Sequence, residues 1–263
     1  NISYLFNSTT TDLKIGTSNH ERLRLTAEGN LGIGNTNPLD TFQVSSKVGE
    51  RQLVNTYVTG KQINPSIGKL INGGYVIVWE SQSQDGSDYG IYGQIFNADG
   101  TRNGNEFKAN TTTSGQQSFP DVAGNLDTDK GGFMVVWSSE ESNGSGTYDI
   151  KAQIYDETKA DGSRNVLSGE INSVNTTTNY TQKYPKVASL TNGNYVVIWE
   201  SNNNNDGNHN IYGQIITSIG NFSGAETAVN SVTTYSQNYP VVAPISADDP
   251  TYAGGFVVAF MSE

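Results

Sequence analysis

The chain contains no cysteine and only two histidines among its 263 residues. The absence of cysteine excludes disulfides, thiolate metal sites and a cysteine nucleophile. His20 and His209 are too few for a histidine-rich metal site and argue against a histidine-based catalytic triad. Basic residues are also scarce, with 15 Lys and Arg against 26 Asp and Glu. The resulting net charge of -11 has the wrong sign for binding nucleic acid.

Long apolar runs are missing as well. No run approaches the roughly 20 residues that a membrane-spanning helix needs, so we expect no membrane insertion. The chain opens on Asn1 without a signal-like apolar stretch, which is typical of a processed product or a segment. Only 16% of the residues are charged, whereas there are 29 Gly and 14 Tyr. This composition favours an extracellular, low-charge β-protein over a cytosolic metabolic enzyme.

An internal repeat organises most of the chain. An apolar segment ending in tryptophan recurs about every 60 residues, and a fourth copy carries phenylalanine in the tryptophan position. A proline precedes each copy, and a segment with a conserved-looking Ile-x-x-Gln-Ile spacing follows the first three. The repeated residues are Trp79, Trp137, Trp199 and Phe260, the glutamines Gln94, Gln153 and Gln214, and the prolines Pro65, Pro120, Pro185 and Pro240.

One unit is interpreted as four short strands. We expect the first around Val54, the second after the proline, the third to end at the tryptophan and the fourth to contain the glutamine. The tryptophan strand is apolar at nearly every position, which predicts burial on both faces. The dipeptides Asn72-Gly73 and Asn192-Gly193 predict type I′ hairpin turns before it.

Four strands per unit, repeated radially, predict an all-β, β-propeller-like array. The predicted repeat domain covers residues 53–263, and its last unit stops before its glutamine strand. A chain of small β-sandwiches is the alternative, although about 60 residues is short for an independent core. The array is either a small closed propeller, a piece of a larger one, or an open array whose edge another segment or subunit covers. The predicted units are 53–107, 108–172, 173–227 and the incomplete 228–263.

Residues 1–50 contain no copy of the repeat. Leu23 and Leu25 alternate with arginines, and Leu31 and Ile33 alternate with glycines, which predicts two strands. Strands this short cannot bury their apolar faces within 50 residues. We therefore expect self-association into a homo-oligomer, a trimer or a filament.

Two resemblances support this division. Residues 21–44, with E-R-L-R-L-T before G-N-L-G-I-G and a proline, resemble the shaft segment of phage and other viral tail fibres, although Asn35 departs from the usual threonine. That resemblance implies a trimeric β-rich shaft near a receptor-binding head. Residues 53–263, with units such as G-G-Y-V-I-V-W-E-S, resemble tryptophan-containing β-repeats of large bacterial surface and secreted proteins. That resemblance implies an extracellular setting.

The repeated side chains have structural and functional interpretations. The three tryptophans could stack on sugar rings, but their apolar strands favour core packing, with Phe260 as their counterpart. Gln94, Gln153 and Gln214 are expected to hydrogen-bond to the backbone of the neighbouring blade.

Acidic residues suggest two kinds of site. Asp85, Asp88 and Asp206 lie on tight turns and could hold Ca²⁺, although simple polar turns also explain them. No other cofactor is expected. The adjacent acids Glu140-Glu141 and Asp248-Asp249 could suggest glycoside hydrolysis, but neither pair recurs in the repeat, and adjacent loop acids are usually solvated. We therefore expect no enzymatic activity and no catalytic residues.

Loops on one rim of the array are the expected binding surface. They combine aromatic, amide and acidic groups, a combination suited to a cell-surface glycan or receptor. The sequence predicts a structural fibre or attachment protein of a virion. The alternatives are a bacterial secreted adhesin or filament subunit and a polysaccharide-degrading tailspike. The candidate ligand-binding residues are Asp88, Tyr89, Tyr148, His209 and Asn210.

Overall fold

The computed structural model divides the chain into two compact units, Asn1–Leu53 and Val54–Glu263. In the first unit it describes only the backbone of four strands. In the second it describes residues 54–125, 127, 131–142, 144–156, 165–166, 169–202, 208–246 and 254–263, and it also describes residues 52 and 53, which lead into this unit. These described residues contain strands and turns but no α-helix. Within them, no helix has the length and apolar character needed to cross a membrane.

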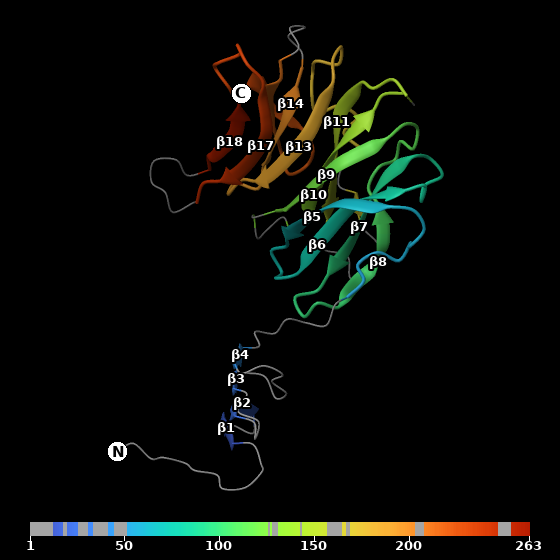
Figure 1. The fold of residues 1–263 in the computed structure, drawn as a ribbon. Helices are drawn as coiled ribbons and strands as arrows, with labels where there is room; N and C mark the ends of the chain where they lie inside the picture. The colour runs from blue at the N-terminus through green and yellow to red at the C-terminus, as the bar shows by residue number, and fades with distance from the viewer. Residues whose placement is uncertain are drawn as a thin grey trace. The chain divides into compact units, whose positions relative to one another are not determined.

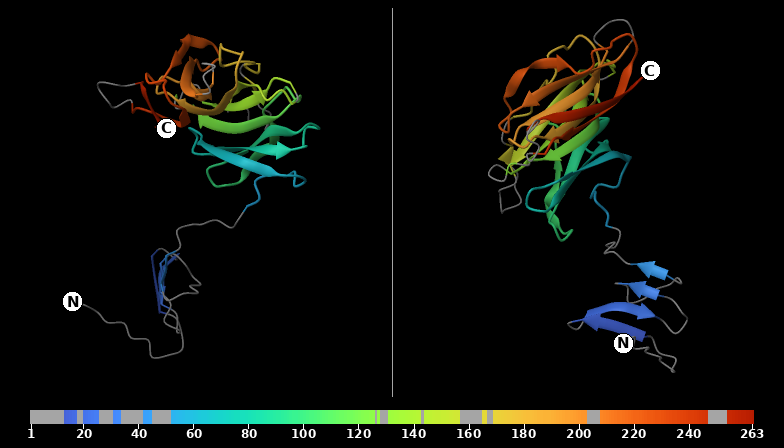
Figure 2. Two further views of the ribbon diagram at one scale, coloured as in Figure 1. Left: turned by 45° about the horizontal axis from the view of Figure 1, so that its top comes forward. Right: turned by 90° about the vertical axis from the view of Figure 1, so that its left-hand side faces the viewer.

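The first unit contains one four-stranded sheet (Figures 1 and 2). Its strands are β1 (Leu13–Thr17), β2 (His20–Leu25), β3 (Leu31–Ile33) and β4 (Phe42–Val44). β1, β2 and β3 pair antiparallel, and β4 pairs with β3 in parallel. Both strands expected from the alternating pattern are present. Association of this unit into a trimer stays a prediction.

The second unit is an all-β, propeller-like array of four-stranded antiparallel sheets, as the repeat predicts (Figure 1). Three sheets are complete, and a two-stranded hairpin follows them. The strands are β5 (Gln62–Lys69), β6 (Tyr75–Gln82), β7 (Tyr89–Phe96) and β8 (Arg102–Lys108) in the first sheet; β9 (Gln117–Gly124), β10 (Phe133–Glu140), β11 (Tyr148–Asp156) and β12 (Asn165–Val166) in the second; β13 (Gln182–Ser189), β14 (Tyr195–Ser201), β15 (Asn210–Ile216) and β16 (Phe222–Ala228) in the third; and β17 (Gln237–Pro244) and β18 (Phe256–Ser262) in the hairpin.

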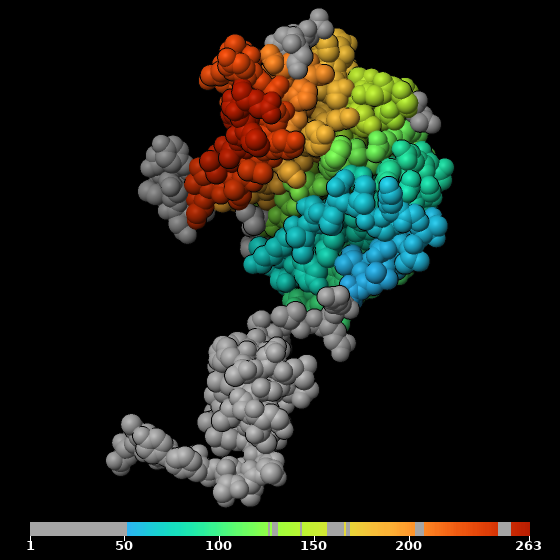
Figure 3. All heavy atoms as spheres, in the orientation of Figure 1, coloured from blue at the N-terminus to red at the C-terminus, as the bar shows by residue number. Residues whose placement is uncertain are grey.

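The proline-containing strands form the inner row of the array. β5, β9, β13 and β17 contact one another in turn, and β9, β13 and β17 each also pack against the tryptophan strand of the preceding sheet. Figure 2 shows the sheets following one another in chain order, and Figure 3 shows the first sheet and the C-terminal hairpin at opposite ends of the unit. Ile67 of the first sheet is 64% exposed, whereas its counterparts Val122 and Val187 in the second and third sheets are 5% and 7% exposed.

The internal boundaries of the units differ from the prediction. Residues around Val54 form no strand. They form the connection that leads into the first sheet. The fourth strand of each complete sheet instead follows the glutamine strand, as β8, β12 and β16 do. The apolar pattern near Val54 therefore marks a connection that packs against a blade rather than an inner strand.

The turns before the tryptophan strands also differ from the predicted type I′. In the first sheet, Gly73 has φ +87°, but Asn72 is not in the left-handed region that a type I′ turn requires at both central positions. The N–H of Gly73 donates to the carbonyl of Leu70, and the N–H of Gly74 donates to the Asn72 side chain. This is the three-residue alternative, a type I turn followed by a left-handed glycine.

The core lies in the seams between neighbouring sheets. Phe133, Val135 and Trp137 of β10 pack against the first sheet, whereas Met134 and Val136 pack against the third. All eight residues of β10 are buried, which confirms the predicted burial on both faces. Trp79, Trp137 and Trp199 are at most 4% exposed, and Phe260 packs against the third cluster, as expected for core side chains.

The repeated glutamines do not bond as predicted. Gln94 donates to the carbonyls of Ile95 and Gly104, which belong to its own sheet. Gln214 likewise donates to Ile215 and Gly224, and Gln153 donates to Ile154. Each of these bonds joins the glutamine to its own strand or to the adjacent outer strand. The side chains therefore stabilise the third and fourth strands of one blade rather than the seam between two.

A repeated asparagine fastens each connection between sheets. Asn175 accepts the N–H of Ile150 at 2.7 Å and donates to the Asp149 carboxylate at 2.6 Å. Asn110 and Asn230 accept the N–H groups of Ile91 and Ile211 in the same way, but they donate to the Asp85 carboxylate and to the Asn210 amide oxygen, respectively.

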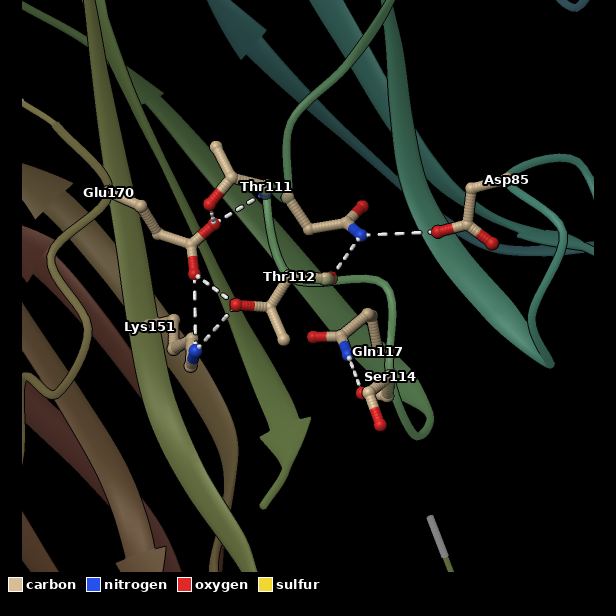
Figure 4. Close-up of polar contacts among 8 residues, drawn as sticks. Asp85, Thr111, Thr112, Ser114, Gln117, Lys151 and Glu170 are labelled. Atoms are coloured by element: carbon tan, nitrogen blue, oxygen red, sulfur yellow. Dashed lines mark hydrogen bonds and ion pairs between the residues drawn. The ribbon is translucent and has the colours of Figure 1, made fainter. Parts of the chain in front are cut away.

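The next residue in the connection contacts the following sheet. Thr111 donates its hydroxyl to Glu170, which also binds Lys151 at 3.1 Å (Figure 4). Thr56 and Thr176 bind Glu106 and Glu226 in the same way. The connections that carry Asn110–Thr111 and Asn175–Thr176 are thus hydrogen-bonded to two successive sheets.

Candidate functional site

Each inner strand carries a strained residue before its proline. Asn64, Phe119, Tyr184 and Tyr239 have φ between +50° and +56°, a region that non-glycine residues occupy rarely and at a cost of about 1 kcal/mol or more. The pairing register of the strand shifts at the same place in all four sheets. This bulge turns the four residues and their prolines toward a shared cavity of about 340 Å³.

Two buried glutamates hold this bulge in place. Glu80 accepts the N–H of Phe119 from the next sheet at 2.6 Å, and Glu200 accepts the N–H of Tyr239 at 2.6 Å. Both glutamates directly follow the tryptophan of their unit and are at most 4% exposed. Burial raises the pKa of each carboxyl, and the donated N–H opposes the rise only in part.

A second cleft lies beside Glu200. It has a volume of about 250 Å³ and includes Lys183, Tyr184 and His209 in its wall. The second oxygen of Glu200 lies 3.4 Å from Nδ1 of His209, whose side chain is 40% exposed. Nδ1 of His209 also lies 3.1 Å from the Asn238 amide oxygen. Glu200 is therefore a buried carboxyl with a raised pKa that reaches an open cleft through a half-exposed histidine.

Glu140 stands beside the same cleft in a contrasting environment. Its carboxylate accepts the N–H of Gly146, a residue of the cleft wall, at 2.9 Å, and the N–H of Gln116 at 3.2 Å. Burial by itself would raise its pKa, but these N–H groups and the charge of Lys183 outweigh burial and lower the pKa. Lys183 sits over the Tyr148 ring, with Nζ 3.7 Å from the ring centroid.

Two carboxyl groups whose pKa values are displaced in opposite directions thus lie at this cleft, Glu200 in its wall and Glu140 hydrogen-bonded to the wall residue Gly146. Glu200 holds a proton more readily than an ordinary glutamate, and Glu140 remains ionised more readily. Such a pair is the usual arrangement for one acid and one base or nucleophile in the same site. Tyr184 and Lys183 add an aromatic ring and a cation beside them.

The predicted ligand-binding residues lie in different environments, and only some of them are at this cleft. Tyr148 and His209 lie at this cleft, Tyr148 through its contact with Lys183. Asp88 lies near enough for its charge to raise the pKa values of Glu80 and Tyr148, and its carbonyl closes a turn with Ser83. Tyr89 is half-buried and pairs with Gln82. Asn210 differs from the prediction, because it is 1% exposed and accepts a hydrogen bond from Asn230.

The calcium prediction has limited structural support. Asp85 uses both carboxylate oxygens as acceptors, from the Ser87 N–H and from the Asn110 side chain. Its carboxylate takes the space above Gly90, where a Cβ would lie 2.6 Å from Asp85 Oδ2. In the described part of the chain, no three His, Asp or Glu side chains gather as metal ligands would. Asp206, like the pair Asp248-Asp249, lies outside the described residues.

Sequence reasoning overlooked the glutamates. The expectation that Glu140 and Glu141 are both solvated loop acids is wrong for Glu140, which is 7% exposed at the end of β10, whereas Glu141 is exposed. The signal for Glu200 was available in the repeat, since an acid follows the tryptophan in two of the four units. A charged residue at the end of an otherwise apolar strand is a candidate for a functional carboxyl.

The radially repeated four-stranded sheets define a protein of the β-propeller type. No protein-family model and no curated protein sequence matches the chain. Among solved structures it is similar to an α-L-arabinofuranosidase of Fusarium graminearum in complex with an iminosugar inhibitor, at 12% identity and TM-score 0.50, over 71% of this chain and 54% of that one. It is also similar to an α-L-arabinanase of Penicillium chrysogenum complexed with arabinobiose, at 18% identity and TM-score 0.49, over 71% and 55%. A third is an endo-arabinase of Bacteroides thetaiotaomicron, at 13% identity and TM-score 0.44, over 81% and 79%.

These comparisons correct two predictions. The predictions of a structural fibre or attachment role and of no enzymatic activity are contradicted, because the fold is shared with an α-L-arabinofuranosidase at a TM-score of 0.50. The adhesin alternative is no better supported. Identities this low establish a shared fold alone. The chain also spans about half the length of the arabinofuranosidase and the arabinanase.

Proposed function

We propose that this chain is a glycoside hydrolase module that acts at the cleft lined by Glu200, beside Glu140. The observation that carries the proposal is the opposite displacement of the two pKa values at one cleft. Glycoside hydrolysis needs one protonated carboxyl and one ionised carboxylate flanking the scissile bond. The cleft wall supplies Tyr184 as an apolar platform for a sugar ring.

The two glutamates have distinct roles in this proposal. Glu200 donates its proton to the glycosidic oxygen as the bond to the anomeric carbon breaks, so the leaving group departs as a neutral alcohol. Glu140 keeps its charge at neutral pH. Its carboxylate either attacks the anomeric carbon or takes a proton from the attacking water, the two roles open to the second carboxylate. His209, beside Glu200, is placed to return a proton to it between turnovers.

The proposed substrate class is a neutral polysaccharide that contains arabinose or xylose. The similar enzymes are an arabinanase, an arabinofuranosidase and a xylosidase, which support a pentose-containing chain. The net charge of -11 disfavours strongly anionic polysaccharides through long-range repulsion. A neutral chain of pentose residues satisfies both considerations.

The test is release of reducing ends from arabinan, arabinoxylan and xylan by the purified chain. Glu200→Gln and Glu140→Gln keep a hydrogen-bond acceptor for the Tyr239 and Gly146 N–H groups, so the fold should persist. We expect each to lower turnover by at least about a hundredfold. Glu141→Gln, next to Glu140 but exposed, is the matched control and should retain activity. Turnover absent on all three substrates, or unchanged in both variants, would refute the proposal.

A further inference from the structure

Tyr184 belongs to the walls of two neighbouring spaces. It lines the cleft that contains Glu200, and it also lines the cavity of about 340 Å³ between the four inner strands, here called the inner-strand cavity. Glu200 provides a second link, because it lies in the cleft wall and accepts the N–H of Tyr239, a residue of the cavity wall. The cleft and the inner-strand cavity are therefore adjacent.

The wall of the inner-strand cavity consists mainly of aromatic and proline residues. Phe119 of β9 and Tyr184 of β13 are half-buried, and their ring centroids lie 4.4 Å apart. Tyr239 of β17 adds a third ring, which is 65% exposed, and Asn64 and Lys186 add polar groups. A largely apolar cavity with a few convergent polar groups is typical of a small-molecule site, and its volume falls within the usual range of roughly 300–1,000 Å³.

The backbone conformation that directs these rings is strained. Phe119 and Tyr184 have φ +55° and +56°, a region that bulky side chains occupy rarely. β9 and β13 each contact an inner strand on both sides, so the strain at these two residues is set within the array. Strained residues of this kind cluster at active sites and ligand clamps. The bulge is therefore a second observation, besides the cavity itself, that indicates a ligand.

The chemistry of this wall fits a sugar chain. The apolar faces of sugar rings pack on aromatic rings, and sugar hydroxyls bond to groups such as those of Asn64 and Lys186. The Phe119 and Tyr184 rings are tilted by 53° to each other. A flat chain with coplanar rings, such as cellulose, cannot lie on both, whereas successive rings of arabinan and xylan chains turn relative to one another. The tilt therefore favours a twisted pentose chain.

We propose that the inner-strand cavity is a second subsite for the polysaccharide, so that the chain selects its substrate by length. A glycan bound in the cleft at Glu200 continues over Tyr184 and places further sugar residues against Phe119. This inference rests on the proposed hydrolase function and adds that a good substrate spans both spaces. Binding energy from the remote subsite then raises turnover of long chains relative to short ones.

The experiment measures binding by calorimetry to Glu200→Gln, which lacks the proton donor for cleavage. Arabinobiose is compared with arabinopentaose, and xylobiose with xylopentaose. In at least one pair, we expect the pentasaccharide to bind at least about tenfold more tightly than its disaccharide, and more tightly than cellopentaose. This preference supports the subsite even if the unaltered chain cleaves nothing, an outcome that would overturn the hydrolase function alone. Equal affinities within both pairs, or equally tight binding of cellopentaose, would overturn the subsite.

Three further variants in the same background locate the subsite. Phe119→Ala removes the aromatic wall and should lower the affinity for that pentasaccharide at least about tenfold, with a smaller effect on the disaccharide. Tyr239→Ala tests the same cavity at a 65% exposed residue, where truncation costs the fold little. Phe222→Ala, at a 48% exposed phenylalanine of β16 that lines neither space, is the matched control and should bind as its background does. Pentasaccharide affinity unchanged by both Phe119→Ala and Tyr239→Ala would overturn the proposal.

Discussion

Replacing Asn175 by alanine should expose the energetic role of the repeated connection between sheets. The side chain is 2% exposed and makes three hydrogen bonds: it accepts from Ile150 and donates to Asp149 and to the Thr177 carbonyl at 2.9 Å. Alanine leaves a buried N–H and a buried carboxylate oxygen without this partner. Each such group costs about 1–3 kcal/mol. We therefore expect the free energy of unfolding to fall by roughly 3–5 kcal/mol.

The chain contains a matched control at the same repeat position. Asn55 is half-buried, and its side-chain amide donates to the Tyr57 carbonyl at 2.7 Å. Asn55→Ala should therefore cost less than about 1 kcal/mol. Urea unfolding followed by tryptophan fluorescence measures both variants under identical conditions. Equal losses for the two variants, or a loss below about 1 kcal/mol for Asn175→Ala, would show that the asparagine contributes little beyond its local turn.

Two further predictions concern stability. Burial raises the pKa of Asp149 from 3.8 to about 6, so its contribution to stability is complete below pH 3.8 and is lost as the pH rises to about 6. Asp149→Asn places at this position the residue type that the third sheet carries as Asn210. Between pH 4 and 7, the variant should lose up to roughly 3 kcal/mol of the pH dependence of the free energy of unfolding, measured by urea unfolding. If the free energy of unfolding of the variant depends on pH as that of the unaltered chain does, the raised pKa of Asp149 is contradicted. Trp199→Phe should destabilise the chain by about 1 kcal/mol more than Trp137→Phe. The reason is that the indole N–H of Trp199 donates to the Gln182 side chain at 3.1 Å, whereas the buried indole N–H of Trp137 has no hydrogen-bond partner. Thermal unfolding midpoints of the two variants decide this, and equal midpoints would mean that the Gln182 bond adds nothing.

The repeat was predictable because each blade is a local unit of alternating strands and turns. Trp79 and Trp199 end apolar strands whose period and length are visible in the residues alone. The outer strands were not predictable in the same way. β8 and β16 contain charged and small residues, and they form because β7 and β15 offer them an open edge, not because of their own apolar pattern.

The candidate site was predictable only in part. Tyr148 and His209 could be placed on one rim because they occupy related loops of successive units. Glu140 could not be separated from Glu141, because the burial of one and the exposure of the other depend on where β10 ends against the loop at Gly146. The pKa values of Glu140 and Glu200 depend on N–H groups donated by residues distant from them in the chain.

By itself, the sequence determined that this chain is all-β, that its unit is about 60 residues long, and that the tryptophans belong to the core. These properties depend on residues close together in the chain, where alternation and turn chemistry act. Tertiary structure alone decided the partners of the glutamines and the hydrogen bonds that surround Glu140 and Glu200. These depend on packing between successive sheets, and no local pattern specifies which N–H group reaches which carboxylate across a seam.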